Sequence, residues 1–389
     1  MTVQFTWRRL VWVATALHVT TVITAALHAA AAPRVQAPGS SPQVPPAIPA
    51  TRTGEDIFRA TCITCHHIDG TGSSRAVVGF DVPLPDFTDC AFATAESDAD
   101  WHSVVHEGGR IRGLDRHMPA FGDALSKADI AKVVTYIRSF CTNKSWPQGD
   151  LNFPRPFFTE KAFPESETVF TTKSARPEGG REIEQAVEYE RRIGPRGQIV
   201  AEIPVAFVRE GEPWMRGLAD VEVGYKHTLL ANLRTGTIVS GGAIVTLPTG
   251  DEAKGLGGGT FVYEPVVYAG QRLPGMSFIQ GQAGLEFPQA SDDERSAYVN
   301  MALGKSFAAD RGFGRLWTPI FEVLWARPFG GDSTWDVVPG VQVSLSKIQH
   351  VRAAVGLRLP VNQRAERPNE FVFYLLWDWA DGGFLQFWK

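Results

Sequence analysis

Residues 62–66 read Cys-Ile-Thr-Cys-His, and this short run constrains the chain more than any other feature. Two cysteines separated by two residues lie on one helical turn, and the histidine after them is held beside whatever they bind. The CxxCH pattern is typical of covalent attachment of a c-type haem, with His66 on one face of the iron. Met118 follows 52 residues after His66 (118 − 66 = 52). A thioether on the second face suits an electron-transfer haem.

A CxxC pair also occurs in zinc sites and in redox dithiols. A zinc site would need further ligands at matching spacing, and the sequence holds no second CxxC pair. A thioredoxin-like dithiol would need a preceding strand and a long following helix. Here a short helical pattern precedes Cys62, and a Gly- and Ser-rich loop follows at 69–74. We therefore favour one covalently bound haem c, held by Cys62, Cys65, His66 and Met118.

The N-terminus has the pattern of an export signal. Arg8 and Arg9 precede an apolar stretch, which ends in an alanine run at 29–32. This order predicts a signal peptide over residues 1–31, removed on export; an uncleaved membrane anchor is the alternative. Residues 32–50 are rich in Pro, Ala, Ser and Gln, which predicts an extended linker. The net charge of −4 gives no indication of nucleic-acid binding.

The four cysteines all lie between Cys62 and Cys141. If two of them hold haem, Cys90 and Cys141 remain. In an exported protein, and hence an oxidising environment, we expect these two to form a disulfide; two unrelated buried thiols are the alternative.

Residues 51–143 show the pattern of a small helical domain. Thr53 precedes one helical segment over 54–65, and a second short helix is expected at 100–105. Ser126 and Asp129 resemble a capping box, and they open a helix with Ile130, Val133, Val134 and Ile137 on one face. That apolar stripe predicts a packed core.

The same residues resemble a class I cytochrome c. Gly54 and Phe58 on the first helix, with Tyr136 on the last, resemble that family's crossed-helix contact. His66 matches its proximal ligand, and the run from Met118 to Phe121 matches its distal-ligand loop. The remaining histidines of the domain (His67, His102, His106 and His117) are weaker candidates for the second axial position. The arginines near Met118 (Arg110, Arg112 and Arg116) either neutralise haem propionates or lie in water.

A connector is expected over residues 144–164. After it, apolar and polar residues alternate along the sequence, as they do in β-strands. In residues 219–229, Val221, Val223 and Tyr225 alternate with Asp220, Glu222 and Lys226. A soluble antiparallel sandwich would place the apolar face inward, whereas a membrane barrel would place it outward and line a polar lumen.

Three features favour an outer-membrane β-barrel over residues 165–389. The predicted strands are long, and their connections alternate between short and long. Aromatic residues also cluster near predicted strand ends, as interfacial girdles require: Tyr263, Tyr268, Trp317, Trp325, Trp335, Trp377, Trp379, Phe387 and Trp388. Eleven strands are predicted from 182 to 378, and residues 165–174 add a twelfth. With an even number of strands, the first strand starts and the last strand finishes on the same side of the membrane as the haem domain. The expected fold is therefore multidomain, a small all-α cytochrome domain followed by an antiparallel barrel of about twelve strands.

The order of cytochrome and then barrel resembles porin–cytochrome fusions of extracellular electron transfer. That resemblance implies an electron carrier at the outer membrane with its haem domain in the periplasm. Its partners would be periplasmic redox proteins and an extracellular electron donor or acceptor. The acidic face of the first predicted strand (Glu182, Glu184, Glu188 and Glu190), with Glu202 beside it, either binds cations or forms an ordinary solvated wall.

Two other functions remain open at this point. The chain could be an outer-membrane channel or transporter with a cytochrome cap, or a soluble cytochrome-linked periplasmic oxidoreductase. No nucleotide-binding loop and no catalytic residues were identified, so an electron carrier is favoured over a substrate-converting enzyme.

Overall fold

The computed structural model describes residues 52–211, 213–290, 294–308 and 315–386. The expected signal peptide (1–31) and linker (32–50) lie outside these residues, as do Phe387 and Trp388. In the described part of the chain, no helix is long and apolar enough to cross a membrane.

The N-terminal part is helical, as predicted. Its helices are α1 Gly54–Thr61, α2 Ile63–His66, α3 Arg75–Val78, α4 Cys90–Ala93, α5 Asp98–Glu107 and α6 Lys127–Arg138, with a 3₁₀ turn η1 Gly109–Arg112 after α5. Thr53 caps α1 in a capping box with Asp56, and the Ser126 side chain caps α6. The single helix expected over 54–65 is divided at Cys62, which ends α1 and begins α2.

Helices α1 and α6 cross closely at Gly54. A Cβ atom at this position would lie 2.2 Å from the carbonyl oxygen of Lys132, so a larger residue would force the helices apart. The Phe58 ring packs against Tyr136, with centroids 5.4 Å apart. The predicted apolar stripe of α6 is buried: Ile130, Val133, Val134 and Ile137. The crossed-helix contact expected from the resemblance is therefore present.

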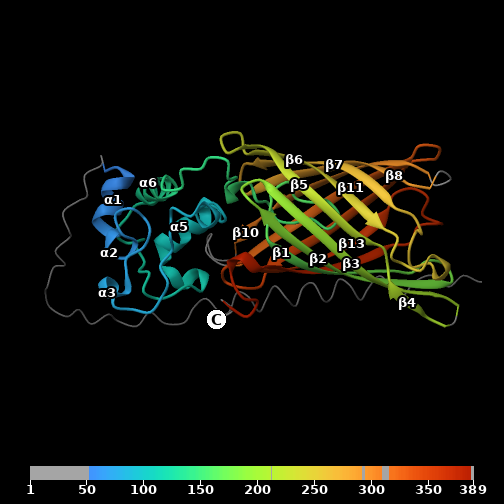
Figure 1. Ribbon diagram of the computed structural model, residues 1–389, viewed down its shortest axis with the longest axis horizontal. Coiled ribbons are helices and arrows are strands. Elements are labelled where there is room, and N and C mark those ends of the chain that lie inside the picture. Colours follow the sequence, from blue (N-terminus) through green and yellow to red (C-terminus); the bar gives the residue numbers. More distant parts are fainter. Residues whose placement is uncertain (1–51, 212, 291–293, 309–314, 387–389) are drawn as a thin grey trace, which may run out of the picture. The chain divides into compact units, whose positions relative to one another are not determined.

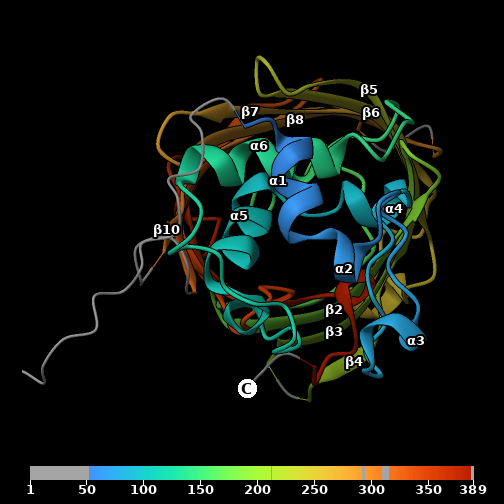
Figure 2. The ribbon, with the colours of Figure 1, turned by 90° about the vertical axis from the view of Figure 1, so that its left-hand side faces the viewer.

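The C-terminal part is a closed antiparallel β-barrel (Figures 1 and 2). Its twelve long strands are β1 Glu167–Ala175, β2 Gly180–Ile193, β3 Gly197–Glu210, β5 Val221–Asn232, β6 Thr237–Leu247, β7 Val262–Leu273, β8 Ser277–Pro288, β9 Ser296–Lys305, β11 Leu316–Pro328, β12 Thr334–Ser344, β13 Val351–Pro360 and β14 Glu370–Asp378. Two short strands, β4 Met215–Leu218 and β10 Phe307–Ala308, pair antiparallel with β3 and β11. Pairing of β14 with β1 and of β9 with β11 leaves no free edge among the long strands.

Apolar side chains point outward from the barrel. Every long strand except β6 carries a large apolar residue that is exposed: Phe170, Val187, Ile203, Tyr225, Val267, Leu285, Met301, Phe321, Trp335, Val355 and Phe373. On β5, Val223 and Tyr225 are exposed whereas Lys226 is buried inside, as the alternation predicted. The assignment of Tyr268 to an outer girdle was wrong, because its place in the β7 alternation turns it inward, where it packs in the luminal core.

The lumen is filled by residues 149–165, which comprise most of the expected connector and the first residue assigned to the barrel. The segment begins with a 3₁₀ turn, η2 Gly149–Leu151. Four of its apolar side chains form one core with residues of the barrel wall: Leu151, Phe153, Ala162 and Phe163. Gly270 makes room for the Phe153 ring, and Gly340 and Gly356 make room for Phe157. We call residues 149–165 the luminal segment.

Polar groups of the wall bind the backbone of the luminal segment at successive positions. The Glu322 carboxylate accepts hydrogen bonds from the amides of Phe157, Phe158 and Thr159. Gln280 donates to the Pro154 carbonyl at 2.8 Å, and Lys226 donates to the Lys161 carbonyl at 2.6 Å. Buried backbone groups need such partners, so the irregular chain is tolerated inside the barrel.

We predict that the luminal segment contributes to the stability of the barrel. Phe153 stacks on Phe278 with ring centroids 5.6 Å apart, and Phe153→Ala should lower the free energy of unfolding by about 3–5 kcal/mol. Phe329→Ala, in an exposed loop position, should have little effect. Urea unfolding of the folded protein in detergent measures both variants, and equal stability would contradict the prediction.

Candidate haem-binding site

The CxxCH residues lie on the short helix α2. Cys62 precedes the helix, and Cys65 and His66 form its last turn. In the described residues, these are the two cysteines outside a disulfide, and both residues are half-buried. Burial raises the pKa of the Cys62 thiol, which keeps it protonated at neutral pH. The pair thus remains available for covalent attachment.

His66 is in the form that binds iron. Burial lowers the pKa of its imidazole to about 4, so the ring is neutral at pH 7. The ring stacks on Phe87 with centroids 4.8 Å apart, which fixes its orientation. Its Nδ1 atom is buried without a hydrogen-bond partner. After His66 the chain turns sharply, since His67 adopts a φ of 57°, and a glycine-containing loop follows.

Met118 lies in a loop that is bonded to the helix before it. The Gly109 amide donates to the Met118 carbonyl at 3.0 Å, and the Phe121 amide donates to the Val105 carbonyl at 2.9 Å. Gly108 has a φ of +82°, and a Cβ atom there would lie 3.0 Å from the Met118 carbonyl oxygen. Met118 is the one methionine of residues 51–143. These contacts therefore fix the backbone from which the Met118 thioether extends.

The other histidines of the domain have partners elsewhere. His117 bonds Asp115 through Nδ1 at 2.5 Å and stacks on Phe80, and His67 bonds Asp69 at 2.7 Å. On α5, His102 and His106 stack on each other, and His106 also bonds Glu107. These contacts favour Met118 over a second histidine as the distal ligand.

Two buried arginines hold the domain together rather than lying in water. Arg112 forms an ion pair with Asp100 at 3.0 Å, and its burial leaves Arg110 and Arg116 as the exposed arginines near Met118. Arg138, at the end of α6, pairs with Asp98 at 3.0 Å and lies over the Trp101 ring. Arg138 was not among the predicted site residues, although its position four residues after Val134 places it on the buried stripe.

Cys90 and Cys141 form a disulfide, which joins the start of α4 to the segment after α6.

The acidic residues of β2 are divided along the barrel. Glu188 and Glu190 point into the lumen and pair with Arg155, Glu184 pairs with Lys173 of β1, and Glu182 is exposed. Glu202, on β3, is half-buried. Cations from the protein itself therefore offset the charge of the inward-facing carboxylates that they contact.

The residues of the CxxCH turn and the Met118 loop fit a c-type haem. Two unoxidised thiols, a neutral imidazole with a fixed ring plane and a thioether on a fixed loop are the donor set that such a group requires. When bound, haem c would supply reversible one-electron transfer between Fe(II) and Fe(III). The protein would attach it through Cys62 and Cys65 and bind its iron through His66 and Met118.

Comparison with known proteins found a family match for the helical part of the chain. Residues 49–137 match the family described as cytochrome C oxidase, cbb3-type, subunit III. A comparison with curated proteins found no match.

Similar solved structures cover just over half of this chain. An outer membrane channel from Pseudomonas putida F1 is 11% identical over 55% of this chain and 96% of its own, with a TM-score of 0.37. The NanC porin is 7% identical over 54% of this chain and 98% of its own, with a TM-score of 0.39. The beta domain of the Bordetella autotransporter BrkA is 13% identical over 55% of this chain and 98% of its own, with a TM-score of 0.35. At such scores these likenesses carry no weight, and the barrel is established by its own strand pairing.

We predict that Met118→Ala keeps covalent haem but changes its axial ligation. The ferric spectrum should lose the long-wavelength sulfur-to-iron charge-transfer band, and the reduction potential should fall, because a thioether ligand raises it. His117→Ala should leave both unchanged. A native spectrum typical of two histidine ligands would contradict the assignment of Met118.

Proposed function

We propose that this chain, a class I cytochrome c domain followed by a closed twelve-stranded barrel, is an electron carrier anchored in the outer membrane. One haem c, bound by Cys62, Cys65, His66 and Met118, would exchange single electrons with periplasmic redox proteins. The barrel would bring the carrier to the membrane where an extracellular donor or acceptor is available. The observation that carries the proposal is the CxxCH turn on a helical domain joined to a barrel with an apolar exterior.

The ligand set supports electron transfer rather than conversion of a substrate. If His66 and Met118 both bind the iron of the haem, no ligand position would be left for a substrate. The neutral imidazole of His66 is stacked on Phe87, and the Met118 loop is bonded to α5. Rigid ligands need little rearrangement when the iron changes its oxidation state.

The exterior of the barrel supports a membrane location. Large contiguous apolar surfaces are rare on proteins surrounded by water, and an outward apolar face with polar residues inside is the pattern of a membrane barrel. Exposed side chains such as Val223, Met301 and Phe321 would gain by contact with lipid. A soluble oxidoreductase would leave them in water.

The filled lumen favours an anchor over an open channel. The luminal segment contacts wall residues on β6, β7, β8, β9 and β11 through one apolar core. Barrels of sixteen strands enclose a water-filled channel, whereas eight-stranded ones are filled by their own side chains. Here twelve strands are filled with the help of an extra piece of chain.

The thickness of the membrane limits how a single haem can act. The hydrocarbon core is about 30 Å thick, so a haem on the periplasmic side cannot reach the outer surface alone. Exchange with an extracellular partner therefore requires an additional carrier that approaches the haem. Electron exchange with a partner on the periplasmic side requires no additional carrier.

Fractionation of cells that express the full chain tests the proposal. The protein should be recovered in outer membranes, should require detergent for extraction, and should retain haem after denaturation. It should be reduced by ascorbate and reoxidised reversibly in a redox titration. In the double variant Cys62→Ser and Cys65→Ser, the barrel should still reach the membrane while haem and redox activity are lost. Recovery of native protein as a soluble periplasmic species would contradict the membrane role.

The outward face gives a second test of the membrane location. Val223→Arg should destabilise the folded barrel by about 2–4 kcal/mol in a bilayer, if Val223 lies near the midplane. Glu222→Arg, on the neighbouring inward position, should cost much less. Because Val223 is exposed, the same substitution in a water-soluble barrel should be nearly neutral, so unfolding in lipid vesicles distinguishes the two settings.

A further inference from the structure

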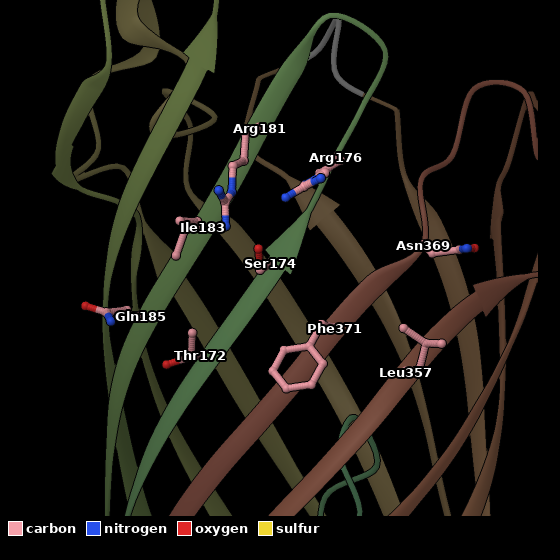
Figure 3. A pocket seen from close by; sticks show the side chains of 9 residues that line it. All are labelled: Thr172, Ser174, Arg176, Arg181, Ile183, Gln185, Leu357, Asn369 and Phe371. Carbon is pink, nitrogen blue, oxygen red and sulfur yellow. The ribbon is translucent and has the colours of Figure 1, made fainter.

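A groove of about 780 Å³ crosses the outer face of the barrel over β1, β2, β13 and β14 (Figure 3). Its floor is formed by the short side chains of Thr172 and Ser174 on β1. Larger apolar side chains border it, Ile183 on one side and Phe371 and Leu357 on the other. The groove exists because small residues lie between large ones on the same face.

The strand register places these residues on the outside of the barrel. Ser174 lies opposite Ile183 of β2 and Phe371 of β14, and Phe371 lies opposite Leu357 of β13. Phe371 and Leu357 are exposed, whereas their neighbours Val372 and Gly356 face inward, where Val372 is fully buried and Gly356 contacts Phe157. The residues that line the groove therefore belong to the outer surface of the barrel, which the proposed function places in lipid.

Two arginines close one end of the groove. Arg176 follows the last residue of β1, and Arg181 is near the first residue of β2, so both lie where the wall ends in a loop. Figure 3 shows them on adjacent segments above Ser174 and Ile183. Among the described residues, neither forms an ion pair, and the Nε atom of Arg181 is buried without a hydrogen-bond partner. Two unpaired guanidinium groups thus lie beside an apolar depression.

An anionic amphiphile complements this arrangement. Guanidinium groups bind phosphate oxygens by charge-assisted hydrogen bonds, and an acyl chain fits an apolar groove that faces lipid. The twelve long strands alternate in direction, so the β1–β2 loop with its two arginines lies at one end of the barrel. β14 finishes at the other end, where the chain arrives from the haem domain. If the haem domain is periplasmic, the arginines lie at the level of the outer leaflet, where the phosphate-bearing lipid is lipid A.

We propose that the groove binds lipid A, with a phosphate between Arg176 and Arg181 and an acyl chain along Ile183, Phe371 and Leu357. This inference rests on the proposed function, since it requires the barrel to lie in the outer membrane with its β1–β2 loop outside. The expected ligand is a phosphorylated lipid rather than free phosphate, because the apolar walls of the groove would bind its acyl chains.

Native mass spectrometry of the full-length, haem-loaded protein in detergent tests the inference, with purified lipid A as the probe. The wild type should retain one lipid A per chain. The double variant Arg176→Gln and Arg181→Gln should bind it about tenfold more weakly or worse, since two hydrogen bonds to a charged group are lost. Arg191→Gln, an exposed arginine near the opposite end of β2, is the matched control and should bind as the wild type does.

A second variant tests the groove itself while keeping both charges. Ser174→Trp should fill the floor and weaken binding as strongly as the arginine variant. Dephosphorylated lipid A should also bind weakly, and inorganic phosphate at millimolar concentration should not compete. Equal retention of lipid A by the wild type and both variants would overturn the inference, as would efficient competition by phosphate alone.

The haem spectrum and the membrane fraction of each variant separate this failure from failure of the proposed function. A variant that remains in the outer membrane with intact haem, and still binds lipid A normally, contradicts the groove alone. Soluble wild-type protein would instead remove the membrane location on which the groove depends.

Discussion

A single buried guanidinium holds the interior of the barrel together. Arg155 of the luminal segment contacts the carboxylates of Glu160, Glu167, Glu188 and Glu190 at 2.5–3.5 Å. A buried charge without partners is costly, so arginine and carboxylates depend on each other. Because Glu167, Glu188 and Glu190 belong to β1 and β2, the same contacts tie the first hairpin of the barrel to the chain inside it.

Hydrogen bonds and an ion pair, in addition to the linking chain, connect the haem domain to the barrel wall. The Asp98 amide at the start of α5 donates to Asp150 at 3.2 Å, and the Gly149 amide donates to the Thr94 carbonyl at 2.8 Å. Asp150 in turn lies 3.9 Å from Arg272 of β7. The chain thus passes from the cytochrome domain into the lumen through a bonded turn. An electron carrier anchored in this way would remain at the membrane during exchange with soluble partners.

The parts of the structure that depend on local periodicity could be predicted from the sequence. The α6 stripe from Ile130 to Ile137 follows from helical spacing, and the alternation on β5 predicts which side of the barrel wall each side chain occupies. The CxxCH run and Met118 predict the haem ligands because their chemistry is narrow, and this assignment stays a prediction. Strand parity also predicted an even number of long strands.

The luminal segment could not be predicted in this way. Its sequence, rich in Pro and Phe, has no regular period and reads as a connector. Its partners are far away in the chain: Glu322, which binds the amides at 157–159, is more than 160 residues distant. Tyr268 was assigned to the outer girdle for a different reason. Residue type and a predicted position near a strand end favoured the membrane interface, whereas the alternation along β7 turns the ring inward, where it packs in the luminal core near Lys226.

Accessibility of opposite barrel ends on intact cells tests the central claim most directly. Glu366, in the β13–β14 loop, and Arg234, in the β5–β6 turn, are both exposed and lie at opposite ends of the barrel by strand parity. A cysteine at each position can be probed with an impermeant thiol reagent in haem-loaded protein. The account predicts labelling at position 366 on intact cells, and at position 234 only after the outer membrane is opened. Equal protection of both positions on intact cells, with equal labelling of both in the soluble periplasmic fraction, would contradict a haem carrier anchored by a membrane-spanning barrel.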